Sequence, residues 1–120
     1  MRVWRHSPTH DAVPELAEPG DLVGRRAVLV AAPPGEDVPR AWLAIDDYDG
    51  PEGTVLFGAP PGDEYRAYVR ALLAAAINEA RLLGFTSLLA HWRAGWASAE
   101  PVLDELGFTS AGNGLWRRPV

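Results

Sequence analysis

Residues 54–92 have the sequence TVLFGAPPGDEYRAYVRALLAAAINEARLLGFTSLLAHW, in which two short apolar runs flank one long amphipathic segment. The first run, Thr54 to Gly58, predicts a strand that a proline- and glycine-rich turn ends. Apolar side chains then recur at steps of three and four residues, so Asp63 to Leu83 is predicted as a helix with one buried face. Gly84 suits the left-handed residue after a helix end, and Phe85 to Trp92 predicts a second strand. This order predicts two parallel strands joined by a right-handed crossover.

The chain before this unit predicts antiparallel strands joined by short loops. Arg26 to Ala32 is a continuous valine-rich run, typical of a strand that is buried on both faces. Ala41 to Ile45 predicts the next strand, and an acidic turn from Asp46 to Gly53 separates it from Thr54 to Gly58. These three strands indicate an antiparallel meander, and Met1 to His6 adds a candidate edge strand.

Two short helices are expected outside the long one. Ala12 to Ala17 predicts the first, with Thr9 or Asp11 as its N-terminal cap. Ala97 to Leu106 predicts the second, with Ser98 as its cap and a proline in its first turn.

The chain ends in a predicted hairpin over Phe108 to Arg117, with a glycine-rich turn at Ala111 to Gly114. The elements together predict a single α/β (α+β) domain across residues 1–120. We expect one mixed, mostly antiparallel sheet with a central parallel βαβ unit. Its core should span residues 26–118, and residues 1–25 should form a short N-terminal lobe.

The composition excludes several kinds of chemistry. The 120 residues contain no cysteine, which removes disulfides, thiolate nucleophiles and cysteine–metal sites. All 11 basic residues are arginine, so no lysine can form a Schiff base or bind phosphate in a P-loop. The net charge of −5 and the scattered arginines argue against a nucleic-acid partner. With no long apolar run and no signal-peptide pattern, we expect a cytoplasmic protein that has no membrane partner.

From Arg26 to Arg118, the order of the expected elements resembles the fold of the GCN5-related N-acetyltransferases (GNAT). Phe85 to Ala90, after Leu83-Gly84, is similar to that family's fifth strand. Asp104 to Phe108 is similar to the end of its closing helix, with the ending leucine-glycine-phenylalanine. Arg70 to Leu73 is similar to the part of its long helix that follows the acyl-CoA loop.

This resemblance implies an acyl-CoA-dependent N-acyltransferase that moves an acetyl group from acetyl-CoA to a small amine. It implies that the backbone of the first predicted parallel strand bonds the pantetheine arm, at Leu56, Phe57, Gly58 and Ala59. It also implies that backbone N–H groups at the start of the long helix face the pyrophosphate; the matching positions are Arg66, Ala67, Tyr68 and Val69.

The sequence departs from the family pattern in the pyrophosphate motif and at the proton donor. The pyrophosphate motif R/Q-x-x-G-x-G/A falls on Glu64 to Val69, so an acid replaces the leading residue, Ala67 replaces the first glycine and Val69 replaces the second. Asp63 and Glu64 place negative charge where the pyrophosphate is expected. The tyrosine that protonates the thiolate aligns with Leu103. A second interpretation is therefore a catalytically inactive GNAT-fold module that binds a ligand or dimerises.

Two side chains are candidates for the catalytic base. His91 ends the second parallel strand, where the parallel strands of a GNAT-like sheet separate, and histidine titrates near neutral pH. The alternative is a half-buried structural histidine. Asp47, with Asp46 and Asp49 beside it, is suited to attract a cationic amine or to act through a water. The alternative for this cluster is a solvated turn.

One further motif has metal-like spacing, but no metal is expected. His6, His10 and Asp11 are spaced as on a helix, yet Pro8 lies between the two histidines and prevents a helix there. The expected partners are a small amine substrate or a protein partner, which includes a second copy of the chain.

Overall fold

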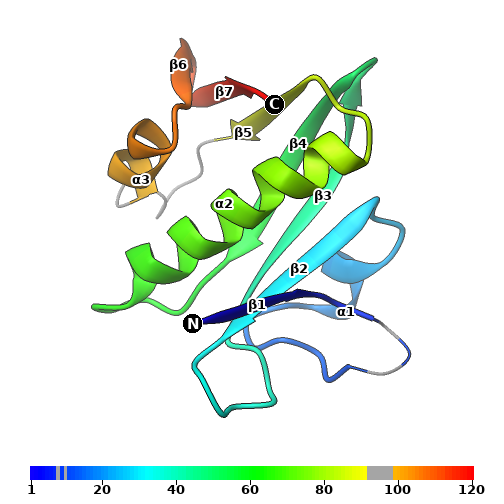
Figure 1. Cartoon of the computed structure of the whole chain (residues 1–120), viewed down its shortest axis with the longest axis vertical. Helices are drawn as coiled ribbons and strands as arrows, with labels where there is room; N and C mark the ends of the chain where they lie inside the picture. Colours follow the sequence, from blue (N-terminus) through cyan, green and yellow to red (C-terminus); the bar gives the residue numbers. More distant parts are fainter. Residues whose placement is uncertain (8, 10, 92–98) are drawn as a thin grey trace.

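The computed structural model describes residues 1–7, 9, 11–91 and 99–120. Within those residues, one seven-stranded sheet has the strand order β1-β2-β3-β4-β5-β7-β6 (Figure 1). All neighbouring strands are antiparallel except β4 and β5, which confirms the predicted mixed sheet with a central parallel pair. The elements are β1 (Arg2–Arg5), α1 (Pro19–Leu22), β2 (Ala27–Ala32), β3 (Ala41–Asp49), β4 (Glu52–Gly58), α2 (Tyr65–Leu82), β5 (Ser87–His91), α3 (Glu100–Glu105), β6 (Thr109–Gly112) and β7 (Leu115–Pro119).

The helix α2 connects the two parallel strands, as the periodicity predicts. Its buried stripe repeats at three- and four-residue steps because 3.6 residues make one turn. The chain leaves the helix through Gly84, whose φ of 87° is strained for any residue with a side chain. The buried residues of the helix are Tyr68, Val69, Leu72, Leu73, Ala76, Ile77 and Ala80.

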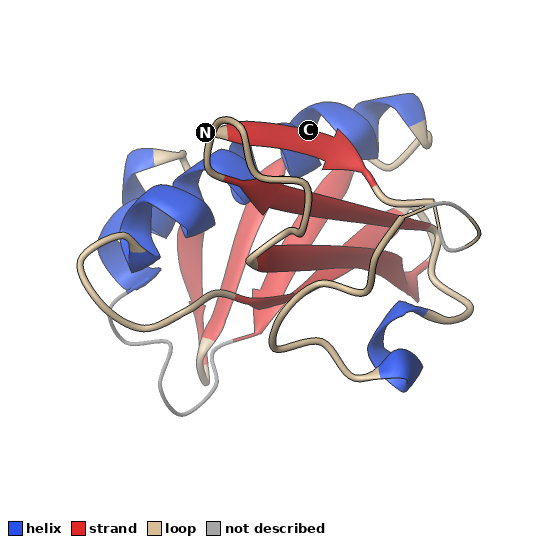
Figure 2. Ribbon diagram, turned by 90° about the horizontal axis from the view of Figure 1, so that it is seen from below, coloured by secondary structure: helices blue, strands red, loops and turns tan. Residues whose placement is uncertain are grey.

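The sheet has two unequal faces (Figure 2). The first, which we call the helix face, packs against α2 and α3 and carries the larger core, including Leu43, Val55 and Leu88. The second, which we call the open face, carries a smaller cluster around Trp42, covered in part by Leu22 of α1. Side chains alternate between the two faces along each strand, so neighbouring residues in the sequence serve different faces.

Two predictions about the N-terminal half are wrong. Residues 12–17 form no helix, because Leu16 has a φ of 66° and the side chain of Asp11 accepts a hydrogen bond from the Ser7 N–H. The first helical turn is instead α1, where the N–H of Glu18 donates to Asp21 Oδ2 at 2.9 Å. The acidic turn is also much shorter than expected, since β3 continues to Asp49 and β4 begins at Glu52.

The C-terminal elements largely follow the prediction. The helix α3 is shorter than expected, with Ala99 as its N-cap, and the predicted cap Ser98 lies outside the described residues. The final hairpin turns at Asn113 and Gly114, whose φ values of 54° and 75° fit a type I′ turn. Across the described ranges, no helix has the length and apolar character needed to cross a bilayer.

Candidate functional site

The two parallel strands stay paired only over their first residues. The β4–β5 ladder runs from Glu52 and Ser87 to Val55 and Ala90, and β4 then continues to Gly58. On its other side, β4 stays paired with β3 up to Gly58. In the described part of the chain, the end of β4 therefore has a strand neighbour on one side only. In general, an extended ligand can add to a sheet as a strand where a strand lacks a neighbouring strand on one side.

A cavity of about 400 Å³ opens on the open face at this point. Leu56 and His91 are the residues that directly follow the last ladder pair on β4 and β5, and Asp46 and Arg25 supply charge beside them. The volume lies within the usual range for small-molecule sites. The described lining consists of Arg25, Ala44, Asp46, Thr54, Val55, Leu56 and His91.

His91 is packed by an aromatic neighbour that the sequence analysis did not single out. The rings of Tyr48 and His91 lie 5.7 Å apart between centroids, at 67° to each other, which is an edge-to-face contact. Tyr48 lies between Asp47 and Asp49, where the β3–β4 register shifts in a bulge. Bulges commonly redirect side chains next to functional sites.

The structure does not bring Asp47 and His91 together. Asp47 lies on the helix face, where Oδ1 accepts a hydrogen bond from Arg26 Nη1 at 2.8 Å. The Arg26 guanidinium in turn lies 5.2 Å from the ring centroid of Phe85, a helix-face core residue. The carboxylate that shares the cavity with His91 belongs to Asp46, which accepts a hydrogen bond from Arg25 at 2.6 Å.

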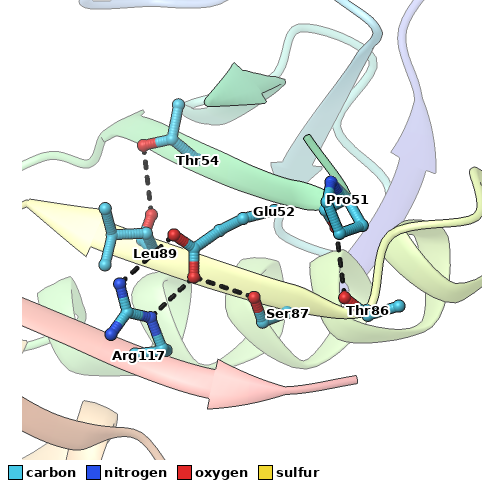
Figure 3. A network of polar contacts seen from close by, with 7 residues as sticks. All are labelled: Pro51, Glu52, Thr54, Thr86, Ser87, Leu89 and Arg117. Carbon is cyan, nitrogen blue, oxygen red and sulfur yellow. Dashed lines mark hydrogen bonds and ion pairs between the residues drawn. The ribbon is translucent and has the colours of Figure 1, made fainter. Parts of the chain in front are cut away.

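Polar contacts link β4 to β5 and β7, and one of them involves Thr54 of the cavity lining (Figure 3). Glu52 accepts hydrogen bonds from Arg117 at 2.6 Å and from Ser87 at 2.8 Å, which links β4, β5 and β7. Thr54 Oγ1 donates to the Leu89 carbonyl at 3.1 Å, also between β4 and β5. The hydrogen bond from Arg117 lowers the pKa of Glu52 below its ordinary value, although burial opposes this shift. The network ties together the two parallel strands before they separate.

The four residues predicted to face a pyrophosphate divide into two pairs. The Tyr68 N–H donates to the Glu64 carbonyl at 3.1 Å, so it is not available to a phosphate, and Val69 lies further into the helix. Both side chains are fully buried, and burial raises the pKa of the Tyr68 phenol. Arg66 and Ala67 lie exposed on the first turn. Tyr68 and Val69 are therefore removed from the expected phosphate-facing groups, and for Arg66 and Ala67 the expectation stays a prediction.

The other predicted positions show how the strand end is built. Leu56 lines the cavity, whereas the Phe57 side chain is buried in the helix-face core. The Trp42 side chain leaves room only for glycine at position 58, because a Cβ there would lie 2.6 Å from Trp42 Nε1. Ala59 packs at the margin of the helix-face core. Leu103, at the position of the family's proton donor, is buried in that core and carries no proton to give.

The fold is shared with solved acetyltransferases. A GCN5-related N-acetyltransferase from Kribbella flavida matches with a TM-score of 0.66 and 18% identity over 78% of this chain. A ribosomal-protein-alanine N-acetyltransferase from Brucella melitensis matches with 0.65 and 19% identity over 78%. A phosphinothricin acetyltransferase from Sinorhizobium meliloti, in complex with acetyl-CoA, matches with 0.68 and 16% identity over 78%.

The chain spans 67%, 68% and 60% of the lengths of these three proteins. No protein-family model and no curated protein matches the sequence. The structural matches establish that this chain has the GNAT fold, as the order of its elements predicts.

Proposed function

We propose that this protein is an acyl-CoA-dependent N-acyltransferase that transfers an acetyl group to a small amine. The observation that supports this function best is the end of the β4–β5 ladder at Val55 and Ala90, with a cavity and His91 at that point. The GNAT fold adds support, because acetyl-CoA is part of the S. meliloti structure named above. The departures at Glu64 and Leu103 make this chain an unusual example of the fold.

The end of β4 and the first turn of α2 would together bind the donor. The backbone from Leu56 to Ala59 would bond the pantetheine arm as an added strand. The N–H groups of Arg66 and Ala67 would face the pyrophosphate, and the Arg66 side chain would add positive charge. Asp63 and Glu64 are exposed beside this turn, so they would weaken phosphate binding.

The chemistry would take place on the open face. When bound, acetyl-CoA supplies a thioester whose carbonyl carbon an amine attacks, so that a C–N bond forms and the C–S bond breaks. His91 would take the proton that the amine nitrogen loses and would pass a proton to the leaving thiolate to give the free thiol. Tyr48 would hold the His91 ring in place through their edge-to-face contact. Asp47 has no part in this scheme, because it lies on the other face.

A calorimetric titration with acetyl-CoA tests donor binding. We expect binding in the micromolar range for the wild-type protein. The variant Glu64→Gln should bind roughly fivefold more tightly, because it removes about 1 kcal/mol of repulsion. Asp49→Asn is the matched control, since it removes an equal charge at the opposite end of the sheet and should leave affinity unchanged. The absence of heat at millimolar acetyl-CoA would reject this function in favour of a non-catalytic module.

An acetyl-transfer assay that measures free thiol tests the role of His91. We expect His91→Gln to lower turnover by about 100-fold, the usual range for a lost general base. Asp47→Asn should keep wild-type turnover, because its carboxylate lies on the helix face. Equal losses in both variants would show that His91 is not the base.

A further inference from the structure

One ion pair is built into the wall of the cavity. Arg25 Nη1 donates to Asp46 Oδ2 at 2.6 Å, and both side chains line the same cavity as His91. The Arg25 side chain is 25% exposed and that of Asp46 33% exposed, so both are mostly shielded from water. Such a pair is screened less than a surface pair and acts strongly on a ligand beside it.

The structure holds the Arg25 guanidinium in a fixed orientation. Its Nε–H donates to the Asp21 carbonyl in α1 at 3.0 Å, while Nη1 donates to Asp46. These bonds among the described residues engage two of the five N–H groups that an arginine carries. The other N–H groups of the planar guanidinium are suited to a carboxylate, which binds arginine through two parallel hydrogen bonds.

The charges of this wall select against simple ions. An amine with no other charge would meet the positive Arg25 beside Asp46, and a simple carboxylate would meet the negative Asp46 beside Arg25. A zwitterion presents both charges in one small molecule and can pair its carboxylate with Arg25 and its ammonium with Asp46. Among the other described lining residues, Ala44 and Leu56 present apolar side chains to the cavity and Thr54 presents a hydroxyl group, whereas the Val55 side chain packs in the helix-face core.

We propose that the acceptor is a free α-amino acid with a small aliphatic side chain. Arg25 binds its carboxylate, Asp46 attracts its ammonium group, and the apolar wall receives its side chain. The acetylation of this amino acid rests on the function proposed above, whereas its binding does not. After the ammonium group loses one proton to solvent, the nitrogen attacks the thioester, so that the C–N bond forms and the C–S bond breaks. His91 takes the second proton from the nitrogen and passes a proton to the leaving thiolate, which gives an N-acetyl amino acid and free thiol.

The test compares the binding of three probes to the wild-type protein without acetyl-CoA. Binding is measured in NMR titrations from the imidazole signals of His91. The probes are L-valine, isobutylamine, which lacks the carboxylate, and isovalerate, which lacks the amine. We expect saturable shifts with L-valine and at least roughly tenfold weaker binding of the other two probes. Each of these two lacks the charged group that would pair with either Arg25 or Asp46. Isobutylamine binding as tightly as L-valine, or no shift with L-valine, would overturn the proposal.

Variants then locate the contacts. Arg25→Gln and Asp46→Asn should each weaken L-valine binding by roughly tenfold or more. The matched controls are Arg26→Gln and Asp47→Asn, which remove the neighbouring ion pair on the other face and should leave L-valine affinity unchanged. Equal effects of both pairs would overturn the assignment.

The two proposals fail separately. Binding of L-valine without any binding of acetyl-CoA would retain the amino-acid site and reject the acyltransferase. Binding of acetyl-CoA without L-valine would do the reverse.

Discussion

The two faces of the sheet divide stability from chemistry. The helix face is covered by α2 and α3, and its buried side chains are almost all apolar. The open face has a small apolar cluster at Trp42 and, further along β3 and β4, a cavity with an ion pair and a histidine. The strand β3 serves both, since Leu43 and Ile45 face the helix while Ala44 and Asp46 face the cavity. Alternate residues along a strand therefore face either the core or the cavity, and this position decides whether a residue can contribute to stability or to chemistry.

The largest expected effect comes from the centre of the helix face. Leu72 is fully buried in α2, so Leu72→Ala should lower the free energy of unfolding by about 3 kcal/mol. Urea denaturation measures this change. Leu82, on the same helix, is 75% exposed, so Leu82→Ala should change stability by less than about 0.5 kcal/mol. Equal losses at both positions would contradict the proposed role of the helix face.

The next effect concerns the end of β4 on the open face. Gly58→Ala should cost about 1–3 kcal/mol, because the new Cβ would overlap the Trp42 indole and force it to move. The same substitution in a Trp42→Phe background should cost clearly less, since the smaller ring leaves room. Urea denaturation of the four proteins of this cycle checks the prediction, and an unchanged penalty would show that Trp42 is not the obstacle.

A smaller effect depends on pH. The pKa of Glu52 is lowered in the folded protein, chiefly by the hydrogen bond from Arg117, so its carboxylate stabilises the fold above its ordinary pKa of about 4.3. That contribution disappears as pH falls through the lowered pKa. We expect the wild type to exceed Glu52→Gln in stability near pH 7 and the difference to shrink towards pH 3. Denaturation curves across this range measure it, and a constant difference would contradict the prediction.

The smallest expected effect is at Tyr48. Its ring packs against His91, and no described hydrogen bond involves its hydroxyl, so Tyr48→Phe should keep turnover within roughly threefold of wild type. Tyr48→Ala removes the ring and should lower kcat more than it raises KM, because the base loses its orientation. If Tyr48→Phe lost as much turnover as Tyr48→Ala, the hydroxyl and not the ring would matter.

Much of the fold follows from periodicity in the sequence. The stripe on α2, the valine-rich β2 and the Asn113-Gly114 turn are local signals, and the structure confirms each. The site is harder to predict because it depends on register. The turn after β3 is shorter than the acidic run indicates, so Asp47 faces the helix and Asp46 faces the cavity.

For two residues of the site, no local sequence pattern predicts that they lie there. Arg25 reaches the cavity only because β2 lies next to β3, so its contact with Asp46 joins residues 21 positions apart. Tyr48 reaches His91 across β4, which lies between their strands. Such contacts follow from the tertiary arrangement, which no short sequence window contains.

The most direct test of this division is an amide-resolved NMR titration with acetyl-CoA. We expect the largest shifts at the end of β4 and the start of α2, at Leu56, Gly58 and Ala67, together with His91. Amides of the β1–β2 pair should not move. Shifts confined to β1 and β2, or a spectrum unchanged at millimolar acetyl-CoA, would contradict the claim that the donor binds where β4 and β5 separate.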